Sequence, residues 1–482
     1  MVKCQECGRS DDFDFYKYCI PCNSVHFRNN FVHWTSGDSN LDKVIQNSQL
    51  NATCPSELIE WIEYSNLENI ELIAHGGFGS VYKAIWKDGP IKDDNAWDFN
   101  KSKWRRKNKK EVAVKKFRDT TNVSSDLLNE VNFNLKMNNE NGGIETIRTY
   151  GVTRDPQNGE YAIVIQFKNG GNLRKMIKEH YSNLTWETIL EILRRISEGL
   201  NSVHESKYYH KDLHSGNILN KILFDNTVGE SVISDFGLCR PMNQSSTDKT
   251  PYGILPFVAP EVLRENEFTE AADIYGFGMI MSELISGETP FADREYDENL
   301  FLAICFGERP QIPEYTPEPY AELMKRCWDP IPTNRPKTEE LQETFDKLLQ
   351  DLDFNEFKSI EDELIEVNGE FKSIEDELIE VNGEFNDDES IEISESESES
   401  IEISEDESIE LNENKSSKLS EDRKLQIKKA FSREREDKWK ARLAELATNP
   451  IPLKDSQNLL TSKRLDYSQS LSLKLSVEDW KK

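Results

Sequence analysis

The stretch YYHKDLHSGNIL, residues 208–219, gathers polar side chains between apolar ends. Asp212 and Asn217 place a carboxylate and an amide five residues apart, and His214 stands between them. Such spacing on a tight loop indicates a candidate reactive site. A structural turn would use the same residue types, because Asp and Asn side chains both hydrogen-bond to nearby backbone. The stretch alone leaves both interpretations open.

A glycine cluster, HGGFGSV at residues 75–81, stands between two strand-like runs. Backbone amides in such a turn can approach anionic oxygen atoms, because no side chain obstructs them. Most glycine clusters only mark turns. Lys115 on the following strand has Glu130, on the next helix, as a candidate partner, although a lysine in a strand is usually solvated.

The cysteines Cys4, Cys7, Cys19 and Cys22 form two C-x2-C pairs that are separated by eleven residues. Two such turns each point two thiolates inward and together complete a tetrahedral zinc shell with Zn–S distances of about 2.3 Å. A closed four-sulfur shell leaves no open coordination position, so we expect a structural zinc ion. Four unliganded thiols at a flexible terminus are the alternative.

The formal net charge of the chain is -30, but this charge is concentrated in one segment. Residues 351–413 hold 26 acidic residues against two lysines, so the rest of the chain carries only -6. A general nucleic-acid or anionic-membrane binder would present an extensive basic face. We therefore expect neither a nucleic acid nor a membrane as a partner.

The first residues, MVKCQE, lack the apolar core of a signal peptide. No apolar run reaches the roughly 18 residues that a membrane-spanning helix needs. We expect an intracellular, cytoplasmic protein, with the nucleus as the alternative compartment. Its cysteines should then be free thiols or metal ligands.

Apolar periodicity predicts the elements that must position these residues. The predicted strands lie at 69–87, 110–117 and 161–167, and the predicted helices lie at 125–137, 185–203 and 271–286. A polar insert that contains WRRKNKK interrupts the strands. We expect a solvated charged loop there, with a localisation signal as the alternative.

The composition changes after residue 354, where EFKSIEDELIEVNG occurs twice, at 356–369 and 370–383. The acidic low-complexity run that follows is predicted to be disordered. Residues 415–482 reverse the charge, with 17 basic against 10 acidic residues. Within them, residues 425–447 are predicted to form a helix that folds back on the acidic run or binds a partner.

The motifs ISDFGLCR, FVAPEVL, ADIYGFGMIMSEL and CWDPIPTNRP follow Asn217 in this order. On these motifs, together with the stretches above, residues 66–350 resemble the protein kinase family. The resemblance implies an α+β, bilobal fold with a sheet-rich N-terminal lobe, a helical C-terminal lobe and ATP in the cleft between them. It also implies that Glu261 pairs with Arg335 and that Asp273 braces the loop of Asp212.

The resemblance further implies a role for each reactive residue. Asp212 accepts or orients the proton of the substrate hydroxyl, and Asn217 and Asp235 bind Mg²⁺. Lys115, paired with Glu130, holds the α- and β-phosphates. The positions implied to line the nucleotide site are Ala74, Gly76, Gly77, Phe78, Gly79, Val81, Ala113, Lys115, Ile165, Gln166 and Phe167, besides the metal ligands Asn217 and Asp235.

Three positions depart from the usual family pattern. Ala74 stands for the first glycine of the phosphate loop, and Lys211 stands for an arginine. His214, which we include in the catalytic set, occupies the position of a lysine in serine/threonine kinases and of an alanine or arginine in tyrosine kinases. HxDLHSGN and LPFVAPE together are more similar to the tyrosine-kinase-like group of serine/threonine kinases than to true tyrosine kinases.

The implied function is ATP-dependent, Mg²⁺-dependent phosphorylation of protein Ser/Thr hydroxyls in intracellular signalling. Dual-specificity or tyrosine phosphorylation and a pseudokinase-like scaffold that acts through its tails are the alternatives. The presence of Lys115, Asp212, Asn217 and Asp235 favours an active enzyme. A protein substrate and a partner of the C-terminal tail are therefore expected.

The sequence divides the chain into five predicted parts. They are a zinc-ribbon-like module at 1–34, a helical connector at 35–65, the kinase domain at 66–350, an acidic, mostly disordered segment at 351–413 and a basic tail with a helix at 414–482. The cysteine pairs, the WTSG connector and the kinase motifs together resemble a kinase group expanded in certain fungi.

Overall fold

The structure is a computed structural model. It describes residues 3–9, 18–75, 79–94, 96–117, 122–141, 146–224, 227–242, 251–352, 422–449 and 460–465. The acidic repeats and the low-complexity run lie outside these ranges, and so do Gly76, Gly77 and Phe78. No helix among the described residues is long and apolar enough to cross a membrane.

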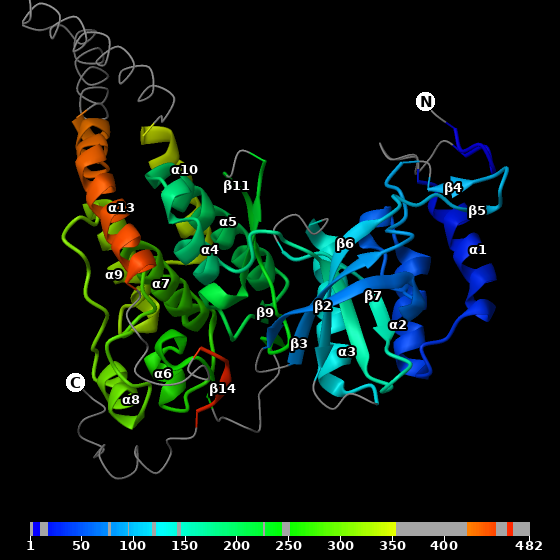
Figure 1. Ribbon diagram of the computed structural model, residues 1–482, viewed down its shortest axis with the longest axis horizontal. Helices are drawn as coiled ribbons and strands as arrows, with labels where there is room; N and C mark the ends of the chain where they lie inside the picture. The colour runs from blue at the N-terminus through cyan, green and yellow to red at the C-terminus, as the bar shows by residue number, and fades with distance from the viewer. Residues whose placement is uncertain are drawn as a thin grey trace, which may run out of the picture. The chain divides into compact units, whose positions relative to one another are not determined.

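The N-terminal lobe is built on a six-stranded sheet with the strand order β1-β7-β8-β6-β3-β2 (Figure 1). The strands are β1 Glu60–Trp61, β2 Leu67–His75, β3 Gly79–Trp86, β6 Lys110–Phe117, β7 Thr149–Arg154 and β8 Tyr161–Gln166. Neighbouring strands are antiparallel, except that β1 runs parallel to β7. Alternate residues of β6, Val112 and Val114, enter a buried cluster with Trp86 and Tyr150. Helix α3, Ser125–Asn141, completes this lobe.

Two helices lie before the sheet in the described part of the chain and pack on this lobe. They are α1 Ile20–Asn30 and α2 Ser39–Asn51. Asp38 caps α2 by accepting hydrogen bonds from the backbone amides of Asn40 and Leu41. The predicted helical connector thus contains α2, and it also supplies β1 at the edge of the sheet.

The polar insert is not simply a solvated loop, so that prediction was wrong. It contains a two-stranded hairpin, β4 Trp97–Asp98 and β5 Lys103–Trp104. The Trp104 ring stacks on Phe27 of α1 with 4.2 Å between ring centroids. Arg106 donates to both carboxylate oxygens of Glu60 at 3.3 and 2.6 Å. The charged residues of WRRKNKK do not indicate these contacts. Trp104 and Arg106 of this run nevertheless contact residues that precede the insert, Phe27 and Glu60.

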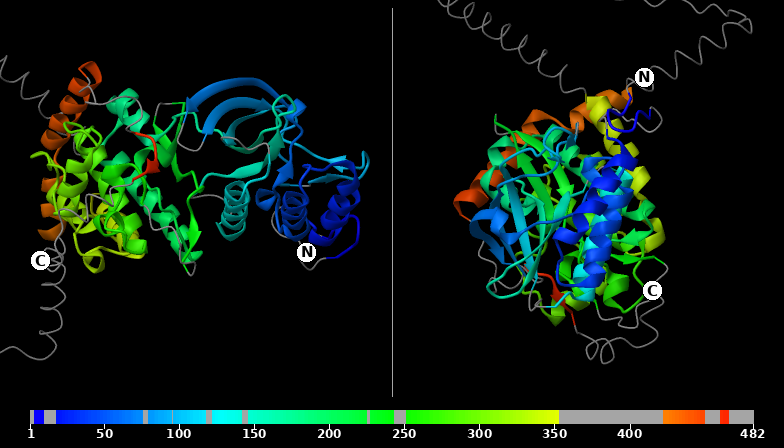
Figure 2. Two further views of the ribbon diagram at one scale, coloured as in Figure 1. Left: turned by 90° about the horizontal axis from the view of Figure 1, so that it is seen from below. Right: turned by 90° about the vertical axis from the view of Figure 1, so that its right-hand side faces the viewer.

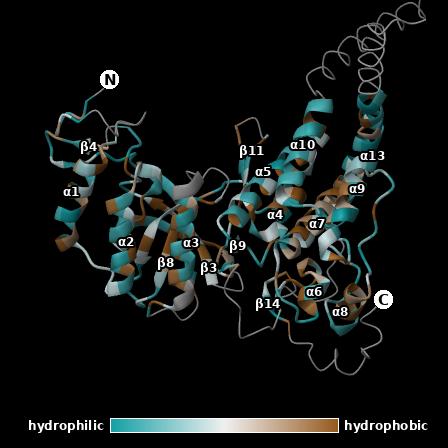
Figure 3. Cartoon of the chain, turned by 180° about the vertical axis from the view of Figure 1, so that it is seen from behind, coloured by the Kyte–Doolittle hydropathy of each residue, from teal (hydrophilic) through white to brown (hydrophobic). Residues whose placement is uncertain are grey.

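The C-terminal lobe is mainly helical, and Figure 3 shows the apolar character of its central helix α7. Its helices are α4 Leu173–Glu179, α5 Trp186–Glu205, α6 Pro260–Leu263, α7 Glu270–Ser286, α8 Glu298–Cys305, α9 Glu318–Cys327 and α10 Thr338–Leu352. Its short strands are β9 Tyr208–Tyr209, β10 Ile218–Ile222, β11 Val228–Ile233 and β12 Arg240–Pro241. Single turns of 3₁₀ helix lie at Phe31–His33, Pro55–Glu57, Tyr64–Asn66, Tyr181–Asn183, Ser215–Asn217, Leu255–Phe257 and Pro332–Asn334.

The C-terminal tail contributes two more elements to the described structure, which Figure 2 shows from two further sides. They are α13, Arg433–Thr448, and β14, Lys463–Arg464, which pairs with β13, Tyr252–Gly253. The single helix predicted at 425–447 is interrupted at 431–432, and a separate helical run covers 422–430. Serine is a preferred residue at helix N-caps, and Ser432 directly precedes α13.

Helix α13 packs on the C-terminal lobe through its apolar face. Trp439 is fully buried, and its ring stacks on Trp186 of α5 with 4.8 Å between centroids. The indole nitrogen of Trp439 donates to the carbonyl of Leu284 in α7 at 3.2 Å. A side chain at Gly287, which ends α7 with φ +75°, would meet Leu443 at 2.4 Å. A glycine therefore serves both the helix end and the approach of α13.

Candidate active site

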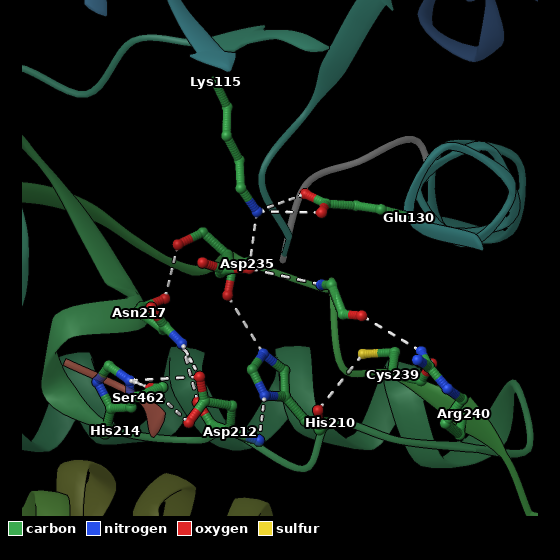
Figure 4. A network of polar contacts seen from close by, with 12 residues as sticks. Lys115, Glu130, His210, Asp212, His214, Asn217, Asp235, Cys239, Arg240 and Ser462 are labelled. Atoms are coloured by element: carbon green, nitrogen blue, oxygen red, sulfur yellow. Dashed lines mark hydrogen bonds and ion pairs between the residues drawn. The ribbon is translucent and has the colours of Figure 1, made fainter. Parts of the chain in front are cut away.

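A buried ion-pair network joins the two lobes (Figure 4). Lys115 Nζ on β6 donates to the two carboxylate oxygens of Glu130 on α3 at 2.8 and 3.0 Å. The same Nζ donates to Oδ1 of Asp235 at 2.7 Å. The predicted contact between Lys115 and Glu130 is therefore present, and it extends to a residue of the other lobe.

Burial and charge oppose each other in this network. Burial disfavours the charged amine of Lys115, but the carboxylates of Asp235 and Glu130 outweigh burial and raise the pKa of the lysine. Burial would also raise the pKa of Asp235, but the nearby Lys115 charge lowers it overall. Lys115 and Asp235 are thus held in their ionised forms.

The loop after β9 carries the second half of the site. The side-chain amide of Asn217 donates to the backbone carbonyl of Asp212 at 2.9 Å. Its amide nitrogen also lies 3.4 Å from Oδ2 of the Asp212 side chain. Asp212 and Asn217 therefore face each other across one tight turn within residues 208–219.

Asp273 of α7 fixes the backbone of this loop from below. Its carboxylate accepts hydrogen bonds from the backbone amides of His210 and Lys211, both at 2.9 Å, and from His204 at 3.0 Å. Lys211 has a φ of +71°, a backbone angle that is costly for residues other than glycine. The predicted bracing by Asp273 is confirmed, and it explains how the strained backbone is retained.

An aromatic column connects α3 with the same loop. The ring of Phe236 lies 4.8 Å from Phe133 on α3 and 5.5 Å from His210, between ring centroids. Burial lowers the pKa of His210. Because its Nδ1 faces the amide of Asp212 and its Nε2 faces the carbonyl of Ser234, a neutral imidazole satisfies both contacts. Phe236 therefore couples the position of Asp235 to the helix that carries Glu130.

The predicted pair of Glu261 and Arg335 is also confirmed. Arg335 Nη1 and Nη2 donate to the two oxygens of Glu261 at 2.7 and 2.8 Å, and Nη1 also donates to the carbonyl of Ala271. A two-pronged arginine–carboxylate contact fixes direction as well as distance. This buried pair anchors α6 to the segment that precedes α10.

The described part of the predicted nucleotide site lies on the sheet. Register places Val81 opposite both Ala74 and Lys115, and Ala113 opposite Ile165. Ile165 and Ala113 are buried, whereas Gln166 at the end of β8 is partly exposed. These positions form a patch beside Lys115. Gly76, Gly77 and Phe78 lie outside the described residues, and Gly79 begins β3.

A serine of the C-terminal tail lies against Asp212. Ser462 Oγ donates to Oδ1 of Asp212 at 2.8 Å, and the ring Nε2 of His214 lies 3.1 Å from the same Oγ. No sequence pattern distinguishes Ser462 from the many other serines of the tail. Figure 4 shows Ser462 beside His214 and Asp212, with Lys115 and Glu130 on the other side of Asp235.

The four cysteines form a separate cluster far from these residues in sequence. Their sulfur atoms all lie within 4.8 Å of one another, with 3.9 Å between Cys4 and Cys22 and 3.7 Å between Cys7 and Cys19. Cys19 directly precedes α1 and Cys22 lies within it, so this part of the module is a helix rather than a ribbon turn. None of the eight cysteines of the chain, all of which are described, forms a disulfide.

The comparison with protein families settles the classification. A family model described as protein tyrosine and serine/threonine kinase matches residues 67–345. The chain belongs to the protein kinase family. The lobes described above are therefore the sheet-rich N-lobe and the helical C-lobe of a kinase domain.

Curated kinases resemble the chain over this domain. They include the dual specificity protein kinase splA of Dictyostelium discoideum, 28% identical over 57% of this chain and 11% of its own length. Mitogen-activated protein kinase kinase kinase 10 of Xenopus laevis is 30% identical over 59% of this chain and 26% of its own length. A probable serine/threonine-protein kinase, drkD of Dictyostelium discoideum, is 27% identical over 64% of this chain. The chain thus spans no more than about a quarter of the length of these three relatives.

The departures from the usual kinase pattern can now be located. Ala74 lies in β2, where its alanine side chain needs no unusual backbone angle. The amine of Lys211 lies over the ring of Phe268, at 5.6 Å from its centroid. His214 accepts a hydrogen bond from the amide of Gly216 through Nδ1 and directs Nε2 toward Asp212 and Ser462. His214 therefore contacts the side of the kinase site that Asp212 forms, which we call the acceptor side.

Proposed function

We propose that this chain is an ATP-dependent protein kinase that transfers the γ-phosphate to Ser/Thr hydroxyls of proteins. One observation carries the proposal. Lys115 contacts Glu130 and Asp235 at 2.7–3.0 Å, while Asp212 and Asn217 are held together on the adjoining loop. All the groups that phosphoryl transfer needs are therefore gathered in one place.

We assign each group a role that its surroundings support. Asp212, buried and directed at a serine hydroxyl, accepts or orients the proton of the acceptor. Asn217 and Asp235 offer an amide oxygen and a carboxylate, which are ligands that Mg²⁺ prefers. Bound there, Mg²⁺ supplies neutralisation of the phosphate charge. Lys115 binds phosphate oxygens while Glu130 orients its amine.

Rigid positioning accounts for much of the proposed catalysis. Phosphoryl transfer requires little covalent chemistry from the protein, so alignment and electrostatic stabilisation dominate. Asp273 holds the loop backbone, and Glu283 accepts hydrogen bonds from both Arg174 at 2.8 Å and Ser215 at 2.5 Å. Helix α7 provides both carboxylates, so one buried helix supports the loop on two sides.

We propose that the cysteine cluster holds one structural zinc ion. In a tetrahedral shell with Zn–S distances of about 2.3 Å, neighbouring sulfur atoms are about 3.8 Å apart. The sulfur pairs at 3.7 and 3.9 Å fit that geometry. The donor set of four thiols is also typical of structural zinc. Zinc would connect the start of α1 to residues 4–9.

We also propose a division of the chain into domains, which the contacts between its parts support. Residues 66–350 form the kinase domain, and residues 1–34 and 35–65 are a zinc module and connector that pack on its N-lobe. The acidic segment at 351–413 lies almost wholly outside the described residues, and the tail at 414–482 provides α13 and β14. An intracellular location stays a prediction from the sequence. A separate partner of the tail stays a prediction.

The test is incubation of the purified chain with ATP, Mg²⁺ and a peptide library, followed by mass spectrometry of the modified residues. We expect phosphoserine and phosphothreonine, and Asp212→Asn should remove both. Phosphotyrosine in addition would establish the dual-specificity alternative. Nucleotide binding without any transfer would establish the pseudokinase alternative and overturn the proposal.

A further inference from the structure

Residues 460–465 occupy the acceptor side of the site, which nothing in the kinase motifs requires. We propose that Ser462 is an intramolecular phosphoacceptor of this kinase, and that residues 460–465 bind as its peptide substrate. This inference rests on the proposed function. It adds a modification site and a class of substrate sequence.

The hydroxyl of Ser462 has the contacts that an acceptor needs. Its Oγ donates to the Asp212 carboxylate at 2.8 Å, which leaves the oxygen lone pairs for other partners. Because Nδ1 of His214 accepts from the amide of Gly216, a neutral His214 carries its proton on Nε2 and donates to Oγ at 3.1 Å. Asp212 and His214 thus orient the hydroxyl from two directions.

The backbone around Ser462 is held in an extended, substrate-like conformation. Strand β14 pairs antiparallel with β13, so that Arg464 lies opposite Tyr252 and Lys463 opposite Gly253. The Leu465 amide donates to the carbonyl of Pro251 at 2.8 Å. Recognition by strand pairing gives affinity through the main chain and selectivity through alternate side chains.

The two residues of β13 support this pairing at two further points. The hydroxyl of Tyr252 donates to the backbone carbonyl of Ser462 at 3.0 Å. Gly253 has a φ of +140°, and a side chain there would meet Val258 at 2.9 Å and the Asp212 carboxylate at 3.4 Å. Gly253 therefore keeps the space beside Asp212 open for the tail.

The burial pattern defines the chemistry of the substrate. Ser462 and Leu465 are 7% and 2% exposed, whereas Lys463 and Arg464 between them are exposed. A peptide of this class carries a serine at the acceptor position and a buried aliphatic residue three positions later. The two intervening basic residues are the exposed residues of β14.

The proposed step balances without any reagent beyond ATP. The Oγ of Ser462 forms a bond to the γ-phosphorus of ATP, and the bond from that phosphorus to the β,γ-bridging oxygen breaks. ADP leaves with the electron pair, and the hydroxyl proton passes to the Asp212 carboxylate. After Asp212 has released this proton, the product phosphate carries nearly two negative charges next to its carboxylate, so repulsion should expel the tail after one turnover.

The experiment uses the full chain, treated first with phosphatase and then supplied with ATP and Mg²⁺. Mass spectrometry follows phosphate at Ser462, while a serine/threonine peptide library reports general activity in the same samples. We expect Ser462 to be phosphorylated with a first-order rate constant that does not change on dilution. An isotope-labelled Asp212→Asn chain mixed with the active chain should stay unmodified at Ser462.

Matched variants separate the acceptor from its neighbours. Ser462→Ala should abolish phosphate at this position, and Ser462→Thr should restore it. Lys463→Ala, a change of the adjacent exposed side chain, should leave the rate at Ser462 within about threefold, because substitutions of exposed side chains usually have small effects. Leu465→Asp should slow Ser462 phosphorylation at least tenfold while leaving activity on library peptides in place.

Three results would overturn the inference. If library peptides are phosphorylated but Ser462 is not, the tail is only a blocking segment and the proposed kinase function survives. Phosphate that appears at Ser462 of the labelled Asp212→Asn chain as fast as in the active chain would show transfer between molecules. Absence of phosphate from both the peptides and Ser462 would defeat the proposed function and this inference together.

Discussion

The N-terminal region, residues 18–65, and the C-terminal tail, through α13 and residues 460–465, both pack on the kinase domain, but they contact different parts of it. The N-terminal region adds β1 to the edge of the sheet, and its Ser36 carbonyl accepts a hydrogen bond from Tyr161 at 2.8 Å. Its contacts thus lie on the N-lobe. The tail instead packs α13 on the C-lobe and continues to Asp212.

This difference separates a region that supports the stability of the fold from a region that controls the reaction. In the described structure the N-terminal region touches the outer strands and the hairpin of the insert, so its loss should lower stability without altering the acceptor side. The tail shares a hydrogen bond with the proposed base, so changes in the tail should alter the reaction itself. Each prediction below tests one side of this division.

The largest effect is expected from Asp212→Asn, because Asp212 belongs to the chemistry and also holds the tail. General base catalysis typically contributes about 10²–10⁴-fold, and we expect turnover of library peptides to fall by that factor while ATP binding persists. Initial rates and nucleotide binding measure the two properties. Asp293→Asn, on an exposed loop, is the matched control. An unchanged rate for Asp212→Asn would refute the assigned role.

The next effect is loss of zinc from the N-terminal region. The double substitution of Cys4 and Cys7 by serine removes two of the four sulfur ligands, so the metal content should fall from one zinc per chain to none. The melting temperature should decrease, whereas kcat of the remaining folded chain should be unchanged. Metal analysis and calorimetry provide the measurement, with Cys54→Ser as the control. A reduced wild-type chain without zinc would contradict this prediction.

A third substitution, Trp439→Ala, attacks the attachment of the tail. Truncating a buried tryptophan typically costs about 3–5 kcal/mol, so α13 should detach from the C-lobe. Phosphorylation of Ser462 should slow, and library peptides should be phosphorylated at least as fast as by the wild type. Leu425→Ala removes an exposed leucine of the tail and serves as the control. Equal slowing of both reactions would show that α13 supports the whole lobe instead.

The smallest effect is expected from Tyr252→Phe, which removes the hydrogen bond to the carbonyl of Ser462. A single such bond contributes about 0.5–1.5 kcal/mol, which corresponds to a fewfold to about tenfold slower phosphorylation of Ser462. Library peptides that lack this contact should be affected less. The ratio of the two rates, measured in one reaction, gives the answer. A ratio equal to that of the wild type would remove Tyr252 from the recognition of the tail.

Local patterns predicted most of the kinase domain. The predicted strand at 110–117 is β6 itself, and the helix expected at 271–286 is α7 with one further residue. Strong periodicity and short-range contacts determine such elements. The contact between Lys115 and Glu130 followed from motif order, because the fold brings these fixed positions together whatever the rest of the sequence is.

Other features depended on contacts that no local pattern records. Ser462 lies 250 residues after Asp212, and its neighbours in sequence resemble many other polar stretches. The charged residues around Trp104 predict a solvated loop, yet Trp104 stacks on Phe27 of α1. The helical period of the apolar residues continues through 431–432, so it does not predict the break there. In each case a distant surface decides the outcome.

The anchoring of α13 also sets how strongly outside substrates are disfavoured. Only residues 449–459 connect the end of α13 to the segment that carries Ser462. A short connection of this kind keeps a bound group at an effective concentration in about the millimolar range. A free peptide of equal intrinsic affinity would have to exceed that concentration to reach Asp212. The chain would therefore phosphorylate its own Ser462 first. Release of the phosphorylated tail would then end the competition between Ser462 and outside substrates.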